Sequence, residues 1–249
     1  MTEGSLDGVI EPLQWDSEHF GFPIARVRDP SDPVQIRGAV DAAESLGVRC
    51  LTMLAKADWT EAIATAEDLG FRCYDVRADL DRKVESAHGS LAQEGLRLAI
   101  DADLPHLEPI AQWRFSATRF AADPHFPREL TRDLYVEWLR RGHRDESRRL
   151  VTSDELDGFV VCHLEGAGGV GTIELIAVSA SSEGIGLSNR LLRGAEALFA
   201  EAGLERAHVV TQGRNLQAQR LYQGYGYRTA DVSLWFHRWG PGAVIYSTK

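Results

Sequence analysis

The sequence predicts an α/β fold, in which helices pack on the faces of a β-sheet. Short runs rich in β-branched and apolar residues alternate with amphipathic segments along most of the 249 residues, the pattern of strands separated by helices. Glycines stand where several of the helical segments end. The chain is 44% hydrophobic and 26% charged, so it has the composition and length to bury a substantial core.

The first part of the chain predicts a small α/β domain over residues 1–85. In order, the expected elements are a strand at 23–28, a helix at 32–47, a strand at 48–55, a helix at 58–70 and a strand at 71–84. Asp58 is the expected N-cap of the second helix, and Gly47 and Gly70 are the expected C-terminal stops. Residues 86–95 are small and polar, which predicts a linker.

The second part predicts a larger domain over residues 96–249. In order, we expect a strand at 96–100, helices that begin near 101 and 127, strands at 148–153, 157–166 and 172–178, a helix at 186–202, a strand at 206–212, a helix at 215–226 and a strand at 227–239.

An internal repeat links the two parts. Residues 69–82 align without a gap with residues 225–238. The identical pairs are Gly70 with Gly226, Arg72 with Arg228, Asp75 with Asp231, Val76 with Val232 and Arg82 with Arg238. Since a strand and a helix precede both segments, the first part is interpreted as a reduced copy of the second.

Composition excludes several classes of function. The net charge of −10, without a clustered basic face, argues against a nucleic-acid-binding protein. No run approaches the roughly 18–20 apolar residues of a membrane span, and the N-terminus lacks the pattern of a signal peptide, so we expect a cytoplasmic protein. Cys50, Cys73 and Cys162 have no metal-ligand spacing, so we expect buried thiols and no metal site; His163 and His208 are expected to be structural.

A glycine-containing turn at residues 181–186 is the main functional signal. It joins the strand at 172–178 to the helix at 186–202, and a helix N-terminus with unpaired N–H groups binds anions. A P-loop is excluded because no lysine follows Gly186. A dinucleotide fingerprint fits poorly, because Asn189 stands at its third glycine position.

The turn and the elements after it resemble the GCN5-related N-acetyltransferases (GNAT). That family has a Q/R-x-x-G-x-G/A loop; Gly184 and Gly186 match its glycines, while Ser181 departs from its first position. The family then has a strand, an Asn at a helix start and a Tyr shortly before a G-[FY] stop, which here are "HVVTQ", Asn215, Tyr222 and "GYGYR". The resemblance implies the GNAT fold, a central mixed twisted sheet flanked by helices, and the use of acetyl-CoA. It also implies that the smaller first domain is a degenerate half of that fold.

The resemblance also implies roles for particular residues. The strand and loop expected to bind acetyl-CoA are Ile176, Ala177, Val178, Glu183, Gly184, Ile185, Gly186, Leu187 and Ser188, joined by Asn215 and Ala218. Tyr222 is the expected general acid that protonates the leaving thiolate. The general base stays open: Glu174 lies near the family's position, but a surface carboxylate is the simpler interpretation.

Four segments resemble a narrower subgroup, the dTDP-fucosamine acetyltransferases of bacterial surface-polysaccharide synthesis. They are 11–21, 114–120, 211–222 and 232–238. This implies a dTDP-4-amino-4,6-dideoxyhexose as acceptor, bound by Trp15, Phe20, Arg114, Arg119 and Gln212, and a homodimer. Two alternatives stay open: another small amine, such as an aminoglycoside or amino acid, or a non-catalytic acyl-CoA-binding module.

Overall fold

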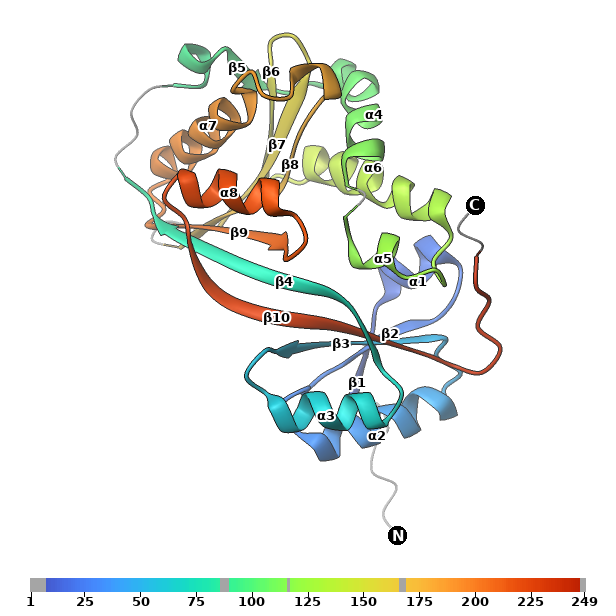
Figure 1. The fold of residues 1–249 in the computed structure, drawn as a ribbon. Helices are drawn as coiled ribbons and strands as arrows, with labels where there is room; N and C mark the ends of the chain where they lie inside the picture. The colour runs from blue at the N-terminus through green and yellow to red at the C-terminus, as the bar shows by residue number, and fades with distance from the viewer. Residues whose placement is uncertain (1–7, 86–89, 116, 166–168, 247–249) are drawn as a thin grey trace.

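The computed structural model describes residues 8–85, 90–115, 117–165 and 169–246. Its first unit, at the bottom of Figure 1, has short strands backed by two helices. In order, the elements are β1 (Ile10–Pro12), α1 (Gln14–Phe20), β2 (Ile24–Val27), α2 (Pro33–Ser45), β3 (Cys50–Lys56), α3 (Thr60–Asp68) and β4 (Arg72–Lys83).

The second unit contains the remaining strands and the longer helices. After a 3-10 turn at Leu91–Glu94, the elements are β5 (Leu96–Leu98), a 3-10 turn (Asp101–Asp103), α4 (Leu104–Arg114), α5 (Arg119–Ala122), α6 (Arg128–Arg144), β6 (Arg148–Ser153), β7 (Gly158–Leu164), β8 (Val170–Val178), a 3-10 turn (Ala180–Ser182), α7 (Leu187–Glu201), β9 (Arg206–Gln212), α8 (Leu216–Gly224) and β10 (Arg228–Trp239).

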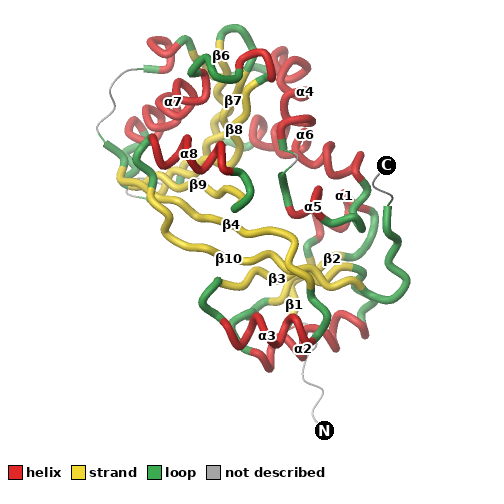
Figure 2. The backbone as a smooth tube through the Cα atoms, in the orientation of Figure 1, coloured by secondary structure: helices red, strands yellow, loops and turns green. Residues whose placement is uncertain are grey.

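The ten strands form one continuous mixed sheet, and helices lie on both of its sides (Figure 2). Its order is β1-β2-β3-β10-β4-β9-β8-β7-β6-β5. The pairs β2–β3 and β8–β9 are parallel and the other pairs are antiparallel. The predicted α/β fold class is therefore confirmed. The boundary between the predicted domains stays a prediction; residues 86–89 of the predicted linker lie outside the described residues.

The two repeat segments exchange their last strands. β10 lies between β3 and β4, so each unit's sheet is completed by the other unit's final strand. Arg77 and Ser233, which are equivalent in the repeat, pair with each other in the ladder. The hydrogen bonds are reciprocal: Arg82 donates to the Tyr225 carbonyl at 2.6 Å, and Arg238 donates to the equivalent Leu69 carbonyl at 2.9 Å. A local two-fold axis thus relates the two repeat segments.

The first unit lacks the features that make the second a candidate site. Its helix α2 begins after Asp32, whose carboxylate accepts a hydrogen bond from Val34 N–H at 2.8 Å and so occupies the anion position of that helix. Counting back along the gapless alignment, Ala66 stands where the second unit has Tyr222, and Ala66 is buried against α2 and the sheet. The first unit therefore has no counterpart of the glycine turn or of Tyr222.

Three hydrophobic clusters hold the sheet and its helices together. One lies between the sheet and α7 and α8, with Phe199 and Tyr227 fully buried. A second packs α1, α4, α5 and α6 against β6, β7 and β8 on the other face, and a third joins α2 and α3 to β1, β2 and β3. Within the described residues, no helix is both long and apolar enough to span a bilayer.

Several local expectations were wrong. Cys50 and Cys162 are buried, but Cys73 is exposed; it lies near the start of β4, before the part of that strand that pairs with β9. Asp58 is not the N-cap of α3: Trp59 stands at that position, without a side-chain cap. The sequence analysis also missed the helices α1 and α5, which are short and lack a clear amphipathic period.

A buried polar cluster ties the loop after α5 to β10. Asp123 is 1% exposed and its carboxylate accepts hydrogen bonds from His237 Nδ1 at 2.8 Å and from Trp239 Nε1 at 2.8 Å. Burial alone would raise the pKa of Asp123, but the bond from His237 lowers it below its usual range. Burial lowers the pKa of His237 from 6.5 to about 4, so its imidazole is neutral in the folded protein at neutral pH.

This cluster predicts an acid-sensitive fold. Between the two pKa values of His237, 6.5 and about 4, the unfolded chain binds a proton that the folded chain does not. The free energy of unfolding therefore falls as pH decreases through this window, by up to about 1.4 kcal/mol per pH unit. Denaturant unfolding at a series of pH values should show a flatter slope for His237→Gln than for the wild type. Equal slopes in the two proteins would contradict the assignment.

Candidate active site

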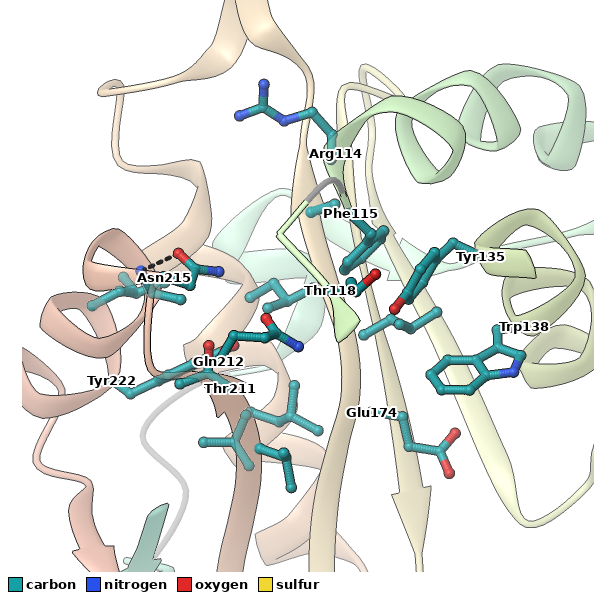
Figure 3. A pocket seen from close by; sticks show the side chains of 18 of the residues that line it. Arg114, Phe115, Thr118, Tyr135, Trp138, Glu174, Thr211, Gln212, Asn215 and Tyr222 are labelled. Carbon is teal, nitrogen blue, oxygen red and sulfur yellow. Dashed lines mark hydrogen bonds between the residues drawn. The ribbon is translucent and has the colours of Figure 1, made fainter. Parts of the chain in front are cut away.

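The candidate site opens where two parallel strands diverge. β8 and β9 pair only from Val170 with Arg206 to Ile173 with Val209. Beyond that point β8 continues on β7 and β9 continues on β4, so the β9-facing edge of residues 174–178 has no strand partner. A cavity of about 900 Å³ occupies this opening. Figure 3 shows Asn215 and Tyr222 on one side of it and Phe115, Tyr135 and Trp138 on the other.

The glycine turn forms one end of the cavity. Gly184 has φ +76° and Gly186 has φ +87°, left-handed conformations that favour glycine, and Gly186 precedes the first residue of α7. A Cβ atom at either position would meet nothing within 4 Å, so the backbone faces open space. Among the described residues, the N–H groups of residues 184–188 have no hydrogen-bond partner. Open backbone, free donors and a 15-residue helix behind them fit a diphosphate.

A carboxylate beneath the turn holds it in shape. Asp157 accepts hydrogen bonds from the hydroxyls of Ser153 and Ser182, and its carbonyl accepts one from Ser179 N–H at 2.7 Å. Burial alone would raise the pKa of Asp157, but these hydroxyls lower it, so the carboxylate stays charged. The turn is therefore anchored to the β6–β7 connection.

Tyr222 is held by the local structure of α8. Asn215 caps this helix, because its Oδ1 accepts a hydrogen bond from Ala218 N–H at 3.1 Å. Tyr222 lies two turns later, is 3% exposed and lines the cavity. Burial raises the pKa of its hydroxyl, so the phenol is protonated at neutral pH.

The other end of the cavity combines aromatic rings with charged groups. The ring centroids of Trp15 and Trp138 lie 6.2 Å apart, and Tyr135 packs edge-on against Trp138 with a centroid distance of 5.4 Å. The Arg119 guanidinium lies 3.9 Å from the centre of the Trp235 ring and forms no salt bridge with a described residue. Burial lowers the pKa of Arg119, yet it stays charged, because an arginine side chain is not deprotonated in proteins.

The structure brings most of the predicted site residues to this one cavity. Those that line it are Trp15, Arg114, Arg119, Ile176, Ala177, Val178, Gly184, Gly186, Leu187, Ser188, Gln212, Asn215, Ala218 and Tyr222. Glu183 and Ile185 belong to the turn but do not line the cavity; Ile185 is 67% exposed. Arg114, expected at the acceptor, instead forms an ion pair with Glu183 beside the glycine turn.

Phe20 is not brought to the cavity. It is 4% exposed and packs against Phe126 at 4.6 Å and Phe120 at 5.3 Å, inside the cluster that joins α1 to α5. The predicted contact of Phe20 with the acceptor is therefore wrong, because this side chain packs in the hydrophobic core. The sequence could not separate it from Trp15, since both are aromatic residues of one seven-residue helix.

Sequence reasoning missed several residues that line the cavity. They are Asp16, Asp75, Arg77, Phe115, Tyr135, Trp138 and Trp235. Asp75 and Trp235 come from the exchanged strands β4 and β10. No local sequence pattern predicts that these two side chains line the cavity. The internal repeat around Asp75 is the one signal that could have drawn attention to that position.

The fold and the second unit are similar to known proteins. A GCN5-related N-acetyltransferase from Sphaerobacter thermophilus has a TM-score of 0.64 at 15% identity, over 96% of this chain and 79% of that chain. A functionally unknown conserved protein from Staphylococcus epidermidis ATCC 12228 has a TM-score of 0.60 at 12% identity, over 88% and 84% of the two chains. Both matches extend over nearly the whole chain, so the two-unit fold recurs outside this protein.

One curated protein is similar in sequence. The spore coat polysaccharide biosynthesis protein SpsD of Bacillus subtilis (strain 168) is 25% identical over 138 residues, which are 53% of this chain and 46% of that protein. The match thus spans less than half the length of that relative.

A family model matches most of the second unit. Residues 107–227 match the model of the acetyltransferase (GNAT) family, a range that includes the glycine turn, the diverging strands and Tyr222. The chain has the GNAT fold and, over residues 107–227, is similar to the acetyltransferase (GNAT) family.

Proposed function

We propose that the protein transfers the acetyl group of acetyl-CoA to the amine of a dTDP-4-amino-4,6-dideoxyhexose. The observation that carries this proposal is the lining of the larger cavity: free backbone N–H groups and a protonated phenol at one end, and tryptophans with arginines at the other. The similarity to a protein named for polysaccharide biosynthesis supports a sugar acceptor.

The second unit binds and activates the donor. Acetyl-CoA supplies the thioester. The N–H groups of the turn, from Glu183 to Ser188, bind its diphosphate, and the unpaired edge of Ile176–Val178 pairs with the pantetheine arm. A free N–H on that edge stabilises the oxyanion of the tetrahedral intermediate. Tyr222 then donates its phenolic proton to the leaving sulfur, which is a stronger base once it is desolvated.

The aromatic end binds the acceptor's nucleotide. Trp15 and Trp138 offer ring faces for stacking on thymine. Trp15 and Arg141 line both the main cavity and a smaller one of about 360 Å³ next to it, which also includes Arg144. Arg119, Arg141 and Arg144 form no salt bridge with a described residue, so these cations are available to the acceptor's diphosphate.

A thiol-release assay over a panel of amines tests the proposal. We expect acetyl-CoA consumption with dTDP-4-amino-4,6-dideoxyhexoses and not with aminoglycosides or free amino acids. In thermal shift, a dTDP-amino sugar should stabilise the protein as acetyl-CoA does. If only an amine without a nucleotide is acetylated, the proposed acceptor is wrong and that amine takes its place. Stabilisation by acetyl-CoA without turnover of any amine would favour an acyl-CoA-binding module.

A further inference from the structure

The acceptor's amine has to lose a proton before it reacts. An aliphatic ammonium ion has a pKa near 10, so the acceptor arrives protonated at neutral pH and has no lone pair for attack. Three carboxylates line the cavity: Asp16, Asp75 and Glu174. Glu174 is occupied, because Arg148 donates two hydrogen bonds to it at 2.7 and 2.8 Å. The candidates for the base are therefore Asp75 and Asp16.

Asp75 is buried but keeps one oxygen free. It is 4% exposed, and its Oδ1 accepts a hydrogen bond from Val76 N–H at 3.0 Å. The same oxygen lies 3.4 Å from Arg214 Nε, a long contact with a partly exposed side chain. Oδ2 has no hydrogen-bond partner among the described residues, although Asp75 lines the cavity. A buried carboxylate with a free oxygen at a cavity suits a cationic ligand.

A β-bulge turns Asp75 toward the cavity. The ladder between β4 and β10 shifts register here: Asp75 pairs with Trp235, while Cys73 pairs with Phe236. The extra residue, Tyr74, re-aims the strand, so Asp75 and Trp235 both line the cavity. Gln212, which pairs with Arg77 in the next strand, lines it as well. Asp75 thus lies beside the end of β9, at the edge of the opening between β8 and β9.

The internal repeat supplies a comparison. Asp231 is the equivalent of Asp75, follows the equivalent bulge, and accepts the same hydrogen bond from the next residue, Val232 N–H at 2.8 Å. Asp231 does not line the cavity, and Lys56 neutralises it at 3.0 Å. The two equivalent carboxylates therefore have different surroundings. Asp231 is partly exposed and paired with a lysine, whereas Asp75 is buried and its salt-bridge contact, with Arg214, is longer at 3.4 Å.

We propose that Asp75 binds the ammonium group of the acceptor and accepts one of its protons, so that the neutral amine attacks the thioester. This rests on the proposed function in requiring acetyl-CoA as the donor and an amine as the acceptor. The nitrogen loses a second proton as the amide forms; one proton leaves through Asp75 to solvent and the other replaces the proton that Tyr222 gives to sulfur. Burial raises the pKa of the Asp75 carboxyl, although the positive charge of Arg214 partly opposes this rise. The raised pKa makes the carboxylate a better proton acceptor.

Asp16 is the alternative base, and the charged groups near both carboxylates have to be compared. Arg214 and Arg119 lower its pKa, and Arg77, two residues away, is occupied by Asp79 with bonds at 2.6 and 2.7 Å. Asp16 lines the same cavity, its pKa is also raised by burial, and the charge of Arg119 opposes that rise. Asp16 stands on α1 next to Trp15, at the aromatic end. The substitutions must therefore compare Asp75 with Asp16.

The test uses the amine that the wild-type protein acetylates fastest in the panel. For Asp75→Asn we expect kcat/KM for that amine to fall about 10²-fold or more at neutral pH, with an unchanged Kd for acetyl-CoA. The deficit should shrink as pH approaches the pKa of the amine, because a neutral amine needs no base. Asp75→Glu should recover part of the rate, and Asp231→Asn should match the wild type.

The possible outcomes distinguish a failure of Asp75 as the base from a failure of the proposed function. Wild-type turnover of an amine, with equal turnover by Asp75→Asn, overturns the base alone, as does a pH-dependent deficit in Asp16→Asn instead. A pH-independent deficit in Asp75→Asn also overturns it, since a structural loss would not be relieved by a neutral amine. Turnover of a different amine changes the proposed acceptor and leaves Asp75 as its base. No amine-dependent thiol release across the panel overturns both.

Discussion

Tyr222→Phe is expected to lower kcat by about 10²-fold or more while leaving the Kd of acetyl-CoA unchanged. The substitution removes one hydroxyl from a side chain that is 3% exposed and keeps the ring that packs against Tyr227 at 5.9 Å. The fold and the donor site should therefore survive. What is lost is the proton for the leaving sulfur, which then departs as a desolvated thiolate. Steady-state kinetics and a binding isotherm for acetyl-CoA measure the two effects separately.

Tyr225→Phe is the matched control. Tyr225 lies on the same helix end, packs beneath Arg82 at 5.0 Å and does not line the cavity. We expect its turnover to match that of the wild-type protein. Wild-type turnover in Tyr222→Phe, or an equal loss in Tyr225→Phe, would remove Tyr222 from proton transfer.

Gly186→Val should raise the Kd of acetyl-CoA by more than about 100-fold. The residue has φ +87°, so a β-branched side chain strains the backbone by on the order of 1–2 kcal/mol. Its Cβ would meet nothing within 4 Å in the protein itself, so the substitution does not clash with the fold. The valine instead fills the space in front of the free N–H groups, where the diphosphate is expected. Calorimetry with acetyl-CoA measures the loss.

Gly203→Val is the control that distinguishes the effect of backbone strain from the loss of the diphosphate-binding site. Gly203 has φ +70°, follows the other end of α7, and its Cβ would also meet nothing within 4 Å. It does not line the cavity. Both variants should lose a similar amount of stability, but only Gly186→Val should lose affinity. Normal affinity in Gly186→Val would contradict the anion site at this turn.

Local patterns were sufficient for the elements that form the donor site. The alternation of apolar residues in β8, the two glycines of the turn and the Asn–Tyr spacing of α8 are short-range features, set by backbone conformation and capping. The sequence pattern therefore predicted the turn, and the resemblance to the GNAT family added the roles of Asn215 and Tyr222 in the same stretch of chain. The model of the family covers the same stretch, residues 107–227.

Long-range packing decided what the sequence did not predict. The exchange of β4 and β10 is invisible in either strand alone, because both read as ordinary strands. The bulge at Tyr74, which brings Asp75 to the cavity, depends on the partner strand. Phe20 and Trp15 have the same aromatic character, and only the packing of α1 on α6 and the phenylalanine cluster distinguishes them.

A structure of the protein with acetyl-CoA bound tests the account most directly. The diphosphate should accept hydrogen bonds from the N–H groups of residues 184–188, and the sulfur should lie within about 3.5 to 4 Å of the Tyr222 hydroxyl. A cofactor bound elsewhere on the protein, or a Tyr222 hydroxyl that points away from the sulfur, would contradict it.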